Sequence, residues 1–312
     1  MNGKKWWDHY SRDVHGGGQG GREHFEKMRL KYASLPKVTL SAFTETGQPE
    51  SSIQVPKQQS YIGRNPVISS FLANTPCSSI GVERLLGKLN TILGTSYTVE
   101  IRSLSSLLEG YTMKGYDFGT VYGHLRQFWY LDLTEIEDTP QTREAWDRQM
   151  RKDVLVNDKI ISRLLPPRRI WDLYSNRVVP WWVARRYPRA ISHAWMKEED
   201  CVDVCTPING CEWPVPMPRD ANLDLIRIEM LNLGAEYAWL DVLCLRQVHG
   251  WREDLRVEEW KLDVPTIGRV YTMSHGELVC YLSGLGRPFS LKEDDLDRRT
   301  MRHSLKRKRG MH

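Results

Sequence analysis

The sequence lacks any long hydrophobic run. Nowhere in its 312 residues is there an uninterrupted apolar stretch of about 18, the length that a membrane-spanning helix requires. The first twenty residues also lack the apolar segment and the small-residue cleavage site of a secretory signal. These absences predict a cytoplasmic protein without a membrane partner. The basic run Lys306–Arg309 makes the nucleus a second expectation.

Cysteine is scarce and irregularly spaced. Six cysteines in a chain with no export signal are typical of reduced thiols rather than of a disulfide framework. His193, Cys201, Cys205 and Cys211 lie close together in the sequence, but their spacing lacks the paired units of a zinc site. We therefore predict no metal site.

Regular structure is expected in only part of the chain. Residues 1–70 are rich in glycine and small polar residues, which predicts a flexible leader with one short helix near 22–32. Residues 71–158 carry apolar residues at helical spacing and predict a mostly helical region. Its helices are expected at 79–94, with Ser79 as cap and Gly94 as stop, at 104–113, at 119–131 and from Thr139 onward. Residues 291–312 are expected to be a charged, disordered tail.

Tryptophan, in contrast, is in excess. The 12 copies exceed the average usage of about 1%, and eight of them lie between Trp171 and Trp260. In this region short apolar runs at 190–195, 237–245 and 277–282 are typical of buried strands. The segments between them are helical, the first from a cap at Asp220 to Gly234 and the second at 256–272. The alternation predicts an α/β domain at 160–290, with a parallel sheet flanked by helices.

The carboxyl ends of these strands are the expected ligand site. Right-handed crossovers bring the ends of parallel strands to one edge of the sheet, where ligands bind in open α/β folds. Here that edge collects residues 192–196, 243–247 and 283–287.

Three segments of the predicted α/β domain resemble the fungal heterokaryon-incompatibility (HET) domain. Residues 190–195 (AISHAW) are similar to the family's LSYVWG element, residues 239–247 (WLDVLCLRQ) to its WIDALCINQ, and residues 267–271 (IGRVY) to its MGxIY. Met196 stands where the family has glycine, and Arg246 where it has asparagine. The resemblance implies a protein of fungal non-self recognition and programmed cell death. Because HET domains are distantly similar to TIR domains, it also implies a flavodoxin/TIR-like sheet and, as a candidate activity, cleavage of NAD.

Candidate site residues follow from the strand edge and the resemblance together. Glu259 is the candidate catalytic carboxylate, since the family places a glutamate before its glycine, here Gly268; its simpler interpretation is a helix-start residue. Asp241 could instead form a buried ion pair with an arginine, and Cys244 could simply be a small packed hydrophobe. Residues that would hold the nucleotide are Ser192, His193, Trp195, Asp241, Cys244, Arg246 and Gln247.

Other functions are compatible with the same sequence. No cofactor is predicted, and NAD enters only as a candidate substrate. A non-catalytic module that self-associates or binds other signalling proteins is the main alternative. Nucleic-acid binding is less favoured: arginines at 163–189 alternate with tryptophans, but no recognition helix or zinc module accompanies them.

Overall fold

A mixed five-stranded sheet forms the centre of the molecule. The computed structural model describes residues 30–41, 60–130, 136 and 138–286, the last range without 158, 163, 274–277 and 283. The strand order is β11-β7-β10-β5-β6. The strands are β5 (Arg169–Asp172), β6 (Arg177–Pro180), β7 (Arg189–His193), β10 (Tyr237–Trp239) and β11 (Val279–Tyr281).

The predicted parallel strands are confirmed, but the sheet as a whole is not parallel. Strands β10, β7 and β11 run parallel to one another, whereas β5 is antiparallel to both β10 and β6. Only four residues, 173–176, connect β5 to β6, and a connection that short joins antiparallel strands only. The chain passes from β7 to β10 on one side and then across to β11 on the other, so β7 is the middle strand of the parallel part.

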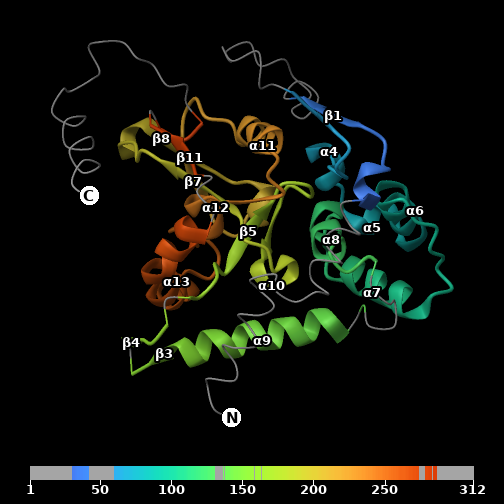
Figure 1. Cartoon of the computed structure of the whole chain (residues 1–312), viewed down its shortest axis with the longest axis horizontal. Coiled ribbons are helices and arrows are strands. Elements are labelled where there is room, and N and C mark those ends of the chain that lie inside the picture. Colours follow the sequence, from blue (N-terminus) through green and yellow to red (C-terminus); the bar gives the residue numbers. More distant parts are fainter. Residues whose placement is uncertain are drawn as a thin grey trace, which may run out of the picture.

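Two helices flank the parallel strands. The helix α11 (Leu223–Asn232) precedes β10, and α13 (Glu253–Met273) precedes β11. Figure 1 shows α11 above the sheet and α13 below it. Asn222, and not the expected Asp220, caps α11, because its side-chain oxygen accepts the amides of Asp224 and Leu225. A hairpin of β8 (Cys201–Val204) and β9 (Val215–Pro218) lies between β7 and α11 in the chain.

The second predicted strand is shorter than expected. It ends at Trp239, and Asp241–Cys244 form the single helical turn α12. The apolar run at 237–245 does not indicate where the strand gives way to the helical turn, because buried strands and buried helical turns have the same apolar composition. Asp241 therefore lies beyond the end of the strand, at the start of a helical turn.

The region before the sheet is helical, as predicted. Its helices are α4 (Ser70–Ala73), α5 (Cys77–Ile80), α6 (Val82–Leu93), α7 (Arg102–Met113), α8 (Phe118–Leu125) and α9 (Asp138–Val154). Gly94 ends α6 in the left-handed conformation, as expected. Ser79 is not a cap but lies inside α5, and Gly81, with φ of 78°, begins α6. None of the described helices is long and apolar enough to cross a membrane.

The flexible leader does not extend to residue 70. Residues 30–33 are helical, and β1 (Val38–Ser41) pairs with β2 (Ser60–Gly63). Leu40, Tyr61 and Ile68 are buried in the core. The remaining parts of the leader, residues 1–29 and 42–59, lie outside the described residues, as does the predicted tail at 291–312.

The helical region and the sheet share one core. In Figure 1 the helices α4–α8 lie beside the sheet, and α9 runs along its lower side. Helix α8 approaches the turn between β5 and β6 closely, because a Cβ atom added at Gly123 would lie 2.8 Å from Ser175 Oγ. Arg126 of α8 forms an ion pair with Asp172 of β5, and both side chains are fully buried. The remaining short elements are β3 (Leu155–Val156), β4 (Lys159–Ile160) and α10 (Trp181–Ala184).

Candidate functional site

A histidine and an aspartate meet at the carboxyl end of the parallel strands. His193 is the last residue of β7, and Asp241 is the first residue of α12. The His193 Nε2 lies 2.9 Å from Asp241 Oδ1, and the two side chains are 6% and 13% exposed. The same Oδ1 accepts the backbone amide of Val242 at 2.8 Å. The sequence left a buried ion pair of Asp241 with an arginine open, and the partner is His193 instead.

The electrostatic environment favours the imidazolium form of His193. Burial lowers the pKa of this histidine, but the hydrogen bond and the negative charge of Asp241 raise it more, so that the pKa lies above its usual 6.5. The other ring nitrogen, Nδ1, lies 3.3 Å from the backbone oxygen of Ala194, which accepts a hydrogen bond from the charged ring. His193 is thus a candidate cation at the strand edge.

Aromatic residues surround this pair. The Trp195 ring lies 5.4 Å from the His193 ring, and Trp195 is 70% exposed, so it does not belong to the core. Tyr271 of α13 meets Trp239 edge to face at 5.8 Å. Burial, followed by the charge of Asp241, raises the pKa of Tyr271 to about 12.

Gln247 braces the loop that carries Asp241. Its Nε2 donates to the backbone oxygen of Leu245 at 2.8 Å and to that of Asp241 at 3.4 Å. Ser192 is half-buried on β7, in register with Cys280 of β11. His193, Trp195, Asp241 and Gln247 therefore lie together, as the sequence predicts.

Cys244 has a packing role. Its side chain is buried, and burial raises the pKa of the thiol to about 12. A thiol that keeps its proton at neutral pH is a poor nucleophile. The interpretation as a small packed hydrophobe fits these observations.

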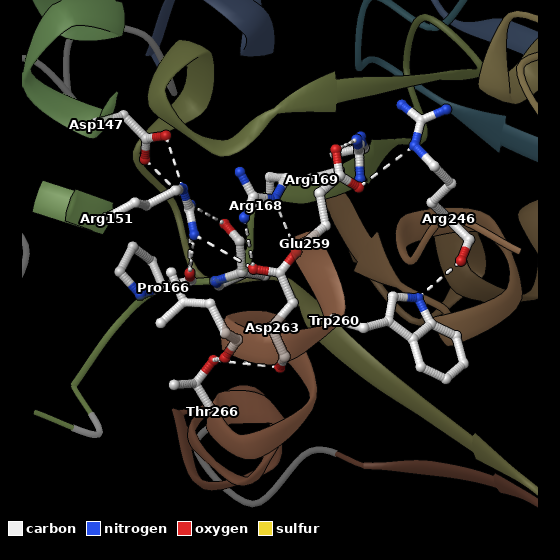
Figure 2. Close-up of polar contacts among 12 residues, drawn as sticks. Asp147, Arg151, Pro166, Arg168, Arg169, Arg246, Glu259, Trp260, Asp263 and Thr266 are labelled. Carbon is white, nitrogen blue, oxygen red and sulfur yellow. Dashed lines mark hydrogen bonds and ion pairs between the residues drawn. The ribbon is translucent and has the colours of Figure 1, made fainter. Parts of the chain in front are cut away.

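Glu259 lies in a separate cluster of arginines and carboxylates, which Figure 2 shows. Arg169 Nη2 of β5 contacts Glu259 Oε1 at 2.6 Å, and Arg246 Nε lies 3.5 Å from Glu259 Oε2. The glutamate side chain is only 11% exposed. Burial raises the pKa of Glu259, but Arg169, Arg168 and Arg246 together lower it by more than burial raises it. The pKa of Glu259 therefore lies below 4.5. The structure thus gives Glu259 the contacts of an ion-pair partner.

Arg246 connects this cluster to the strand edge. Its Nη2 contacts Glu212 Oε2 at 2.8 Å, and its Nη1 donates to the backbone oxygen of Trp251 at 2.9 Å. The Trp213 ring has the guanidinium groups of Arg246 and Arg169 near it, at 5.0 and 5.2 Å. In Figure 2 Arg246 also accepts, through its backbone oxygen, the indole hydrogen of Trp260. Arg246 is thus held by ion pairs with Glu212 and Glu259 and by its hydrogen bond to Trp251.

The carboxylates in the rest of this cluster, Asp263 and Asp147, were not among the residues predicted from the sequence. Asp263 of α13 binds Arg168 through both carboxylate oxygens, at 2.7 and 3.1 Å, and lies 3.7 Å from Arg151 of α9. Asp147 completes the chain of contacts with two hydrogen bonds from Arg151. A hollow of about 570 Å³ opens beside it, lined by charged residues of α9 and α13 and by Trp182. The arginine-rich segment at 163–189 was the only signal, and it indicates no particular partner.

Among the residues that the structure describes, no group of three or more potential ligands is arranged to hold a metal ion. Comparison with known proteins adds no information, because no protein-family model, no curated protein and no solved structure matches this chain.

Proposed function

We propose that this protein is a HET-like domain protein of fungal non-self recognition and cell-death signalling. The observation that carries the proposal is the convergence of the three segments that resemble the family. His193 of the first segment bonds Asp241 of the second, and Tyr271 of the third packs against Trp239 of the second. Segments that lie far apart in the sequence thus contact one another at one edge of the sheet.

The ligand that we propose for this edge is a nucleotide, with NAD as the first candidate. Its position beside β7 supports this, because ligands of open α/β sheets bind where the chain connections diverge on either side of one strand. The exposed Trp195 offers a face on which a base can stack, and the imidazolium of His193 offers a positive charge for phosphate.

If NAD is cleaved here, water would displace nicotinamide from the ribose and yield ADP-ribose and a proton. Such a reaction needs a carboxylate near the ribose. We propose Asp241 for this place rather than Glu259. Among the described residues, both side-chain hydrogen bonds of Asp241 run to Oδ1, which leaves Oδ2 for the sugar, whereas both oxygens of Glu259 face arginines.

The experiment measures NAD binding and nicotinamide release by the full chain. Trp195→Ala removes the stacking face, which is worth about 1–3 kcal/mol, so binding should weaken by about 5- to 150-fold. Trp251→Ala is the matched control, because Trp251 is 80% exposed and belongs to another loop. Asp241→Asn should abolish nicotinamide release, and Glu259→Gln should leave it intact in folded protein. Absence of NAD binding by the wild type, or equal losses in both tryptophan variants, would refute the nucleotide assignment.

Self-association is the second candidate, and it has its own supporting observation. Strand β11 is the outermost strand at one end of the described sheet, and Leu278 and Leu282 beside it are 42% and 66% exposed. Such an edge can pair with the same strand of a second copy. Light scattering at increasing protein concentration should then report a dimer for the wild type and a monomer for Leu282→Lys. Identical masses for the two proteins would exclude this mode of association.

A further inference from the structure

The hollow between α9, α10 and α13 has the size and the lining of a ligand site, and none of its lining residues belongs to the strand edge. Its volume of about 570 Å³ lies within the roughly 300–1,000 Å³ of pockets that hold small molecules. Trp182 of α10, Leu155 of β3 and Leu262 of α13 supply its apolar lining. The other lining residues are charged side chains of α9 and α13 together with Arg168. The hollow therefore offers an apolar and a charged surface to the same ligand.

Arg168 has one edge of its guanidinium group left over. Its Nε and Nη2 donate to the two carboxylate oxygens of Asp263 at 2.7 and 3.1 Å, and these bonds, drawn in Figure 2, fix the plane of the group. Nη1 has no hydrogen bond to any residue that the structure describes. The Arg168 side chain is 25% exposed and lines the hollow, whereas Asp263 does not line it. Because guanidinium donors form a fixed fork, the second edge of Arg168 matches the two oxygens of another carboxylate.

The charges of the lining favour a ligand with a single negative charge. Lys152 is exposed on α9, and no carboxylate among the described residues pairs with it. The acidic residues of the lining are each paired with a cation, in the pairs Glu144–Arg148, Asp147–Arg151 and Glu258–Lys261. Lys152 and the second edge of Arg168 thus remain for an anion. The nearby carboxylates would repel the second charge of a phosphate ester, so a carboxylate fits better.

We propose that this hollow binds a small organic carboxylate with a flat apolar body. The carboxylate accepts hydrogen bonds from the second edge of Arg168 and pairs with Lys152, while the body packs against Trp182 and Leu262. The hollow lies where α9 of the helical region meets α13 beside the sheet, and ligand sites occur preferentially at such junctions. This site is independent of the nucleotide site proposed for the strand edge.

Isothermal titration calorimetry of the full chain with naphthoate tests the proposal. We expect one naphthoate to bind per chain, with a Kd below about 1 mM. Naphthamide has the same flat body without the charge, and it should bind about tenfold more weakly, because hydrogen bonds to an ionised group are stronger. Naphthyl phosphate carries a second charge and should bind no more tightly than naphthoate.

Two variants and two matched controls locate the bound naphthoate. Lys152→Gln should weaken its binding about fivefold, and Trp182→Ala about tenfold. Lys88→Gln removes the same charge from an exposed position on α6, and Trp195→Ala removes the exposed indole of the strand edge. Neither control should change naphthoate binding. Because Lys152 is exposed, its variant keeps the test decisive even if Trp182→Ala fails to fold.

Several results would overturn the proposal. These are the absence of saturable naphthoate binding, equal binding of naphthamide, and tighter binding of naphthyl phosphate. Loss of binding in Trp195→Ala would place naphthoate at the strand edge instead of the hollow. A Lys152→Gln protein that binds naphthoate as tightly as Lys88→Gln would also refute the assignment. None of these results bears on NAD binding by the wild type, so the two proposals fail separately.

Discussion

The ion pair between Arg126 and Asp172 is a buried link between the helical region and the sheet. Arg126 Nε and Nη2 donate to the two Asp172 oxygens at 2.9 and 2.7 Å, and Nη1 contacts Glu236 Oε1 at 2.5 Å. The guanidinium also lies between the rings of Tyr174 and Tyr237, at 4.7 and 4.8 Å from their centres. Both side chains of the Arg126–Asp172 pair are fully buried, so removal of Asp172 leaves Arg126 in a poorly solvated place with Glu236 as its remaining counter-ion.

Asp172→Asn should therefore be strongly destabilising. Breaking a buried pair by removing one partner costs about 3–5 kcal/mol, a large part of the 5–15 kcal/mol that typically stabilise a folded domain. Arg126→Met combined with Asp172→Asn should cost less than the sum of the two single variants, because neither of the two fully buried charges then remains without the other. Glu144→Gln is the control: its partner Arg148 is 67% exposed, so the change should stay within about 0.5 kcal/mol.

The measurement is urea unfolding of the full chain, followed by far-UV circular dichroism and by tryptophan fluorescence. The first signal reports mainly the helices, whereas most tryptophans lie in or near the sheet. Because the two regions share a core, both signals should show one coincident transition that moves to lower urea in Asp172→Asn. A change below about 1 kcal/mol, or two separate transitions in the wild type, would refute the view that the pair ties the two regions into one unit.

Three further predictions concern the strand edge, the arginine cluster and two glycines. The pKa of His193, measured by NMR, should lie above 6.5 in the wild type and below 6.5 in Asp241→Asn. The His193–Asp241 pair stabilises the folded protein below pH 6.5, and this contribution is lost as the pH rises through the raised pKa of folded His193. The free energies of unfolding of the two proteins should therefore converge at alkaline pH. Glu259→Gln should cost about 1–3 kcal/mol near pH 7, and urea unfolding should show this difference vanish as the pH falls through the lowered pKa of Glu259. Gly268→Ala should stabilise α13 by about 0.5–1 kcal/mol, because no atom lies within 4 Å of the added carbon. Gly250→Ala should instead lower the melting temperature, because its added carbon would lie 2.6 Å from the Glu212 backbone oxygen.

The fold could be predicted where the apolar pattern had one interpretation. Helices such as α6 and α11 have an apolar face and are followed by glycines with positive φ, so their presence and their C-terminal ends were found, whereas the predicted caps Ser79 and Asp220 were wrong. The parallel strands β7, β10 and β11 were found because their runs are short, apolar and separated by helices. The hairpin of β5 and β6 was missed, because the alternating arginines and tryptophans at 163–189 do not show the apolar run of a buried strand, whereas Arg177 is in fact buried against Asp117. A charge pattern cannot reveal a buried partner that is 60 residues away in the sequence.

The candidate site was predicted in its position more reliably than in its chemistry. Topology alone places His193 and Asp241 at the same edge, since each follows a parallel strand, and no side-chain detail is needed. The environment of Glu259 depends on Arg169 and Arg246, which come from a strand and a loop on either side of it in space. Contacts of this kind depend on the packed structure, and neither spacing nor composition indicates them.

The loop from Asp241 to Gln247 is held at both ends, which has a consequence for any ligand at the strand edge. Asp241 is bound to β7 through His193, and Arg246 is bound to α13 through Glu259 and to the β8–β9 loop through Glu212. Gln247 closes the loop by donating to its backbone. A ligand that binds Asp241 therefore meets a site already in place and loses little free energy to ordering it.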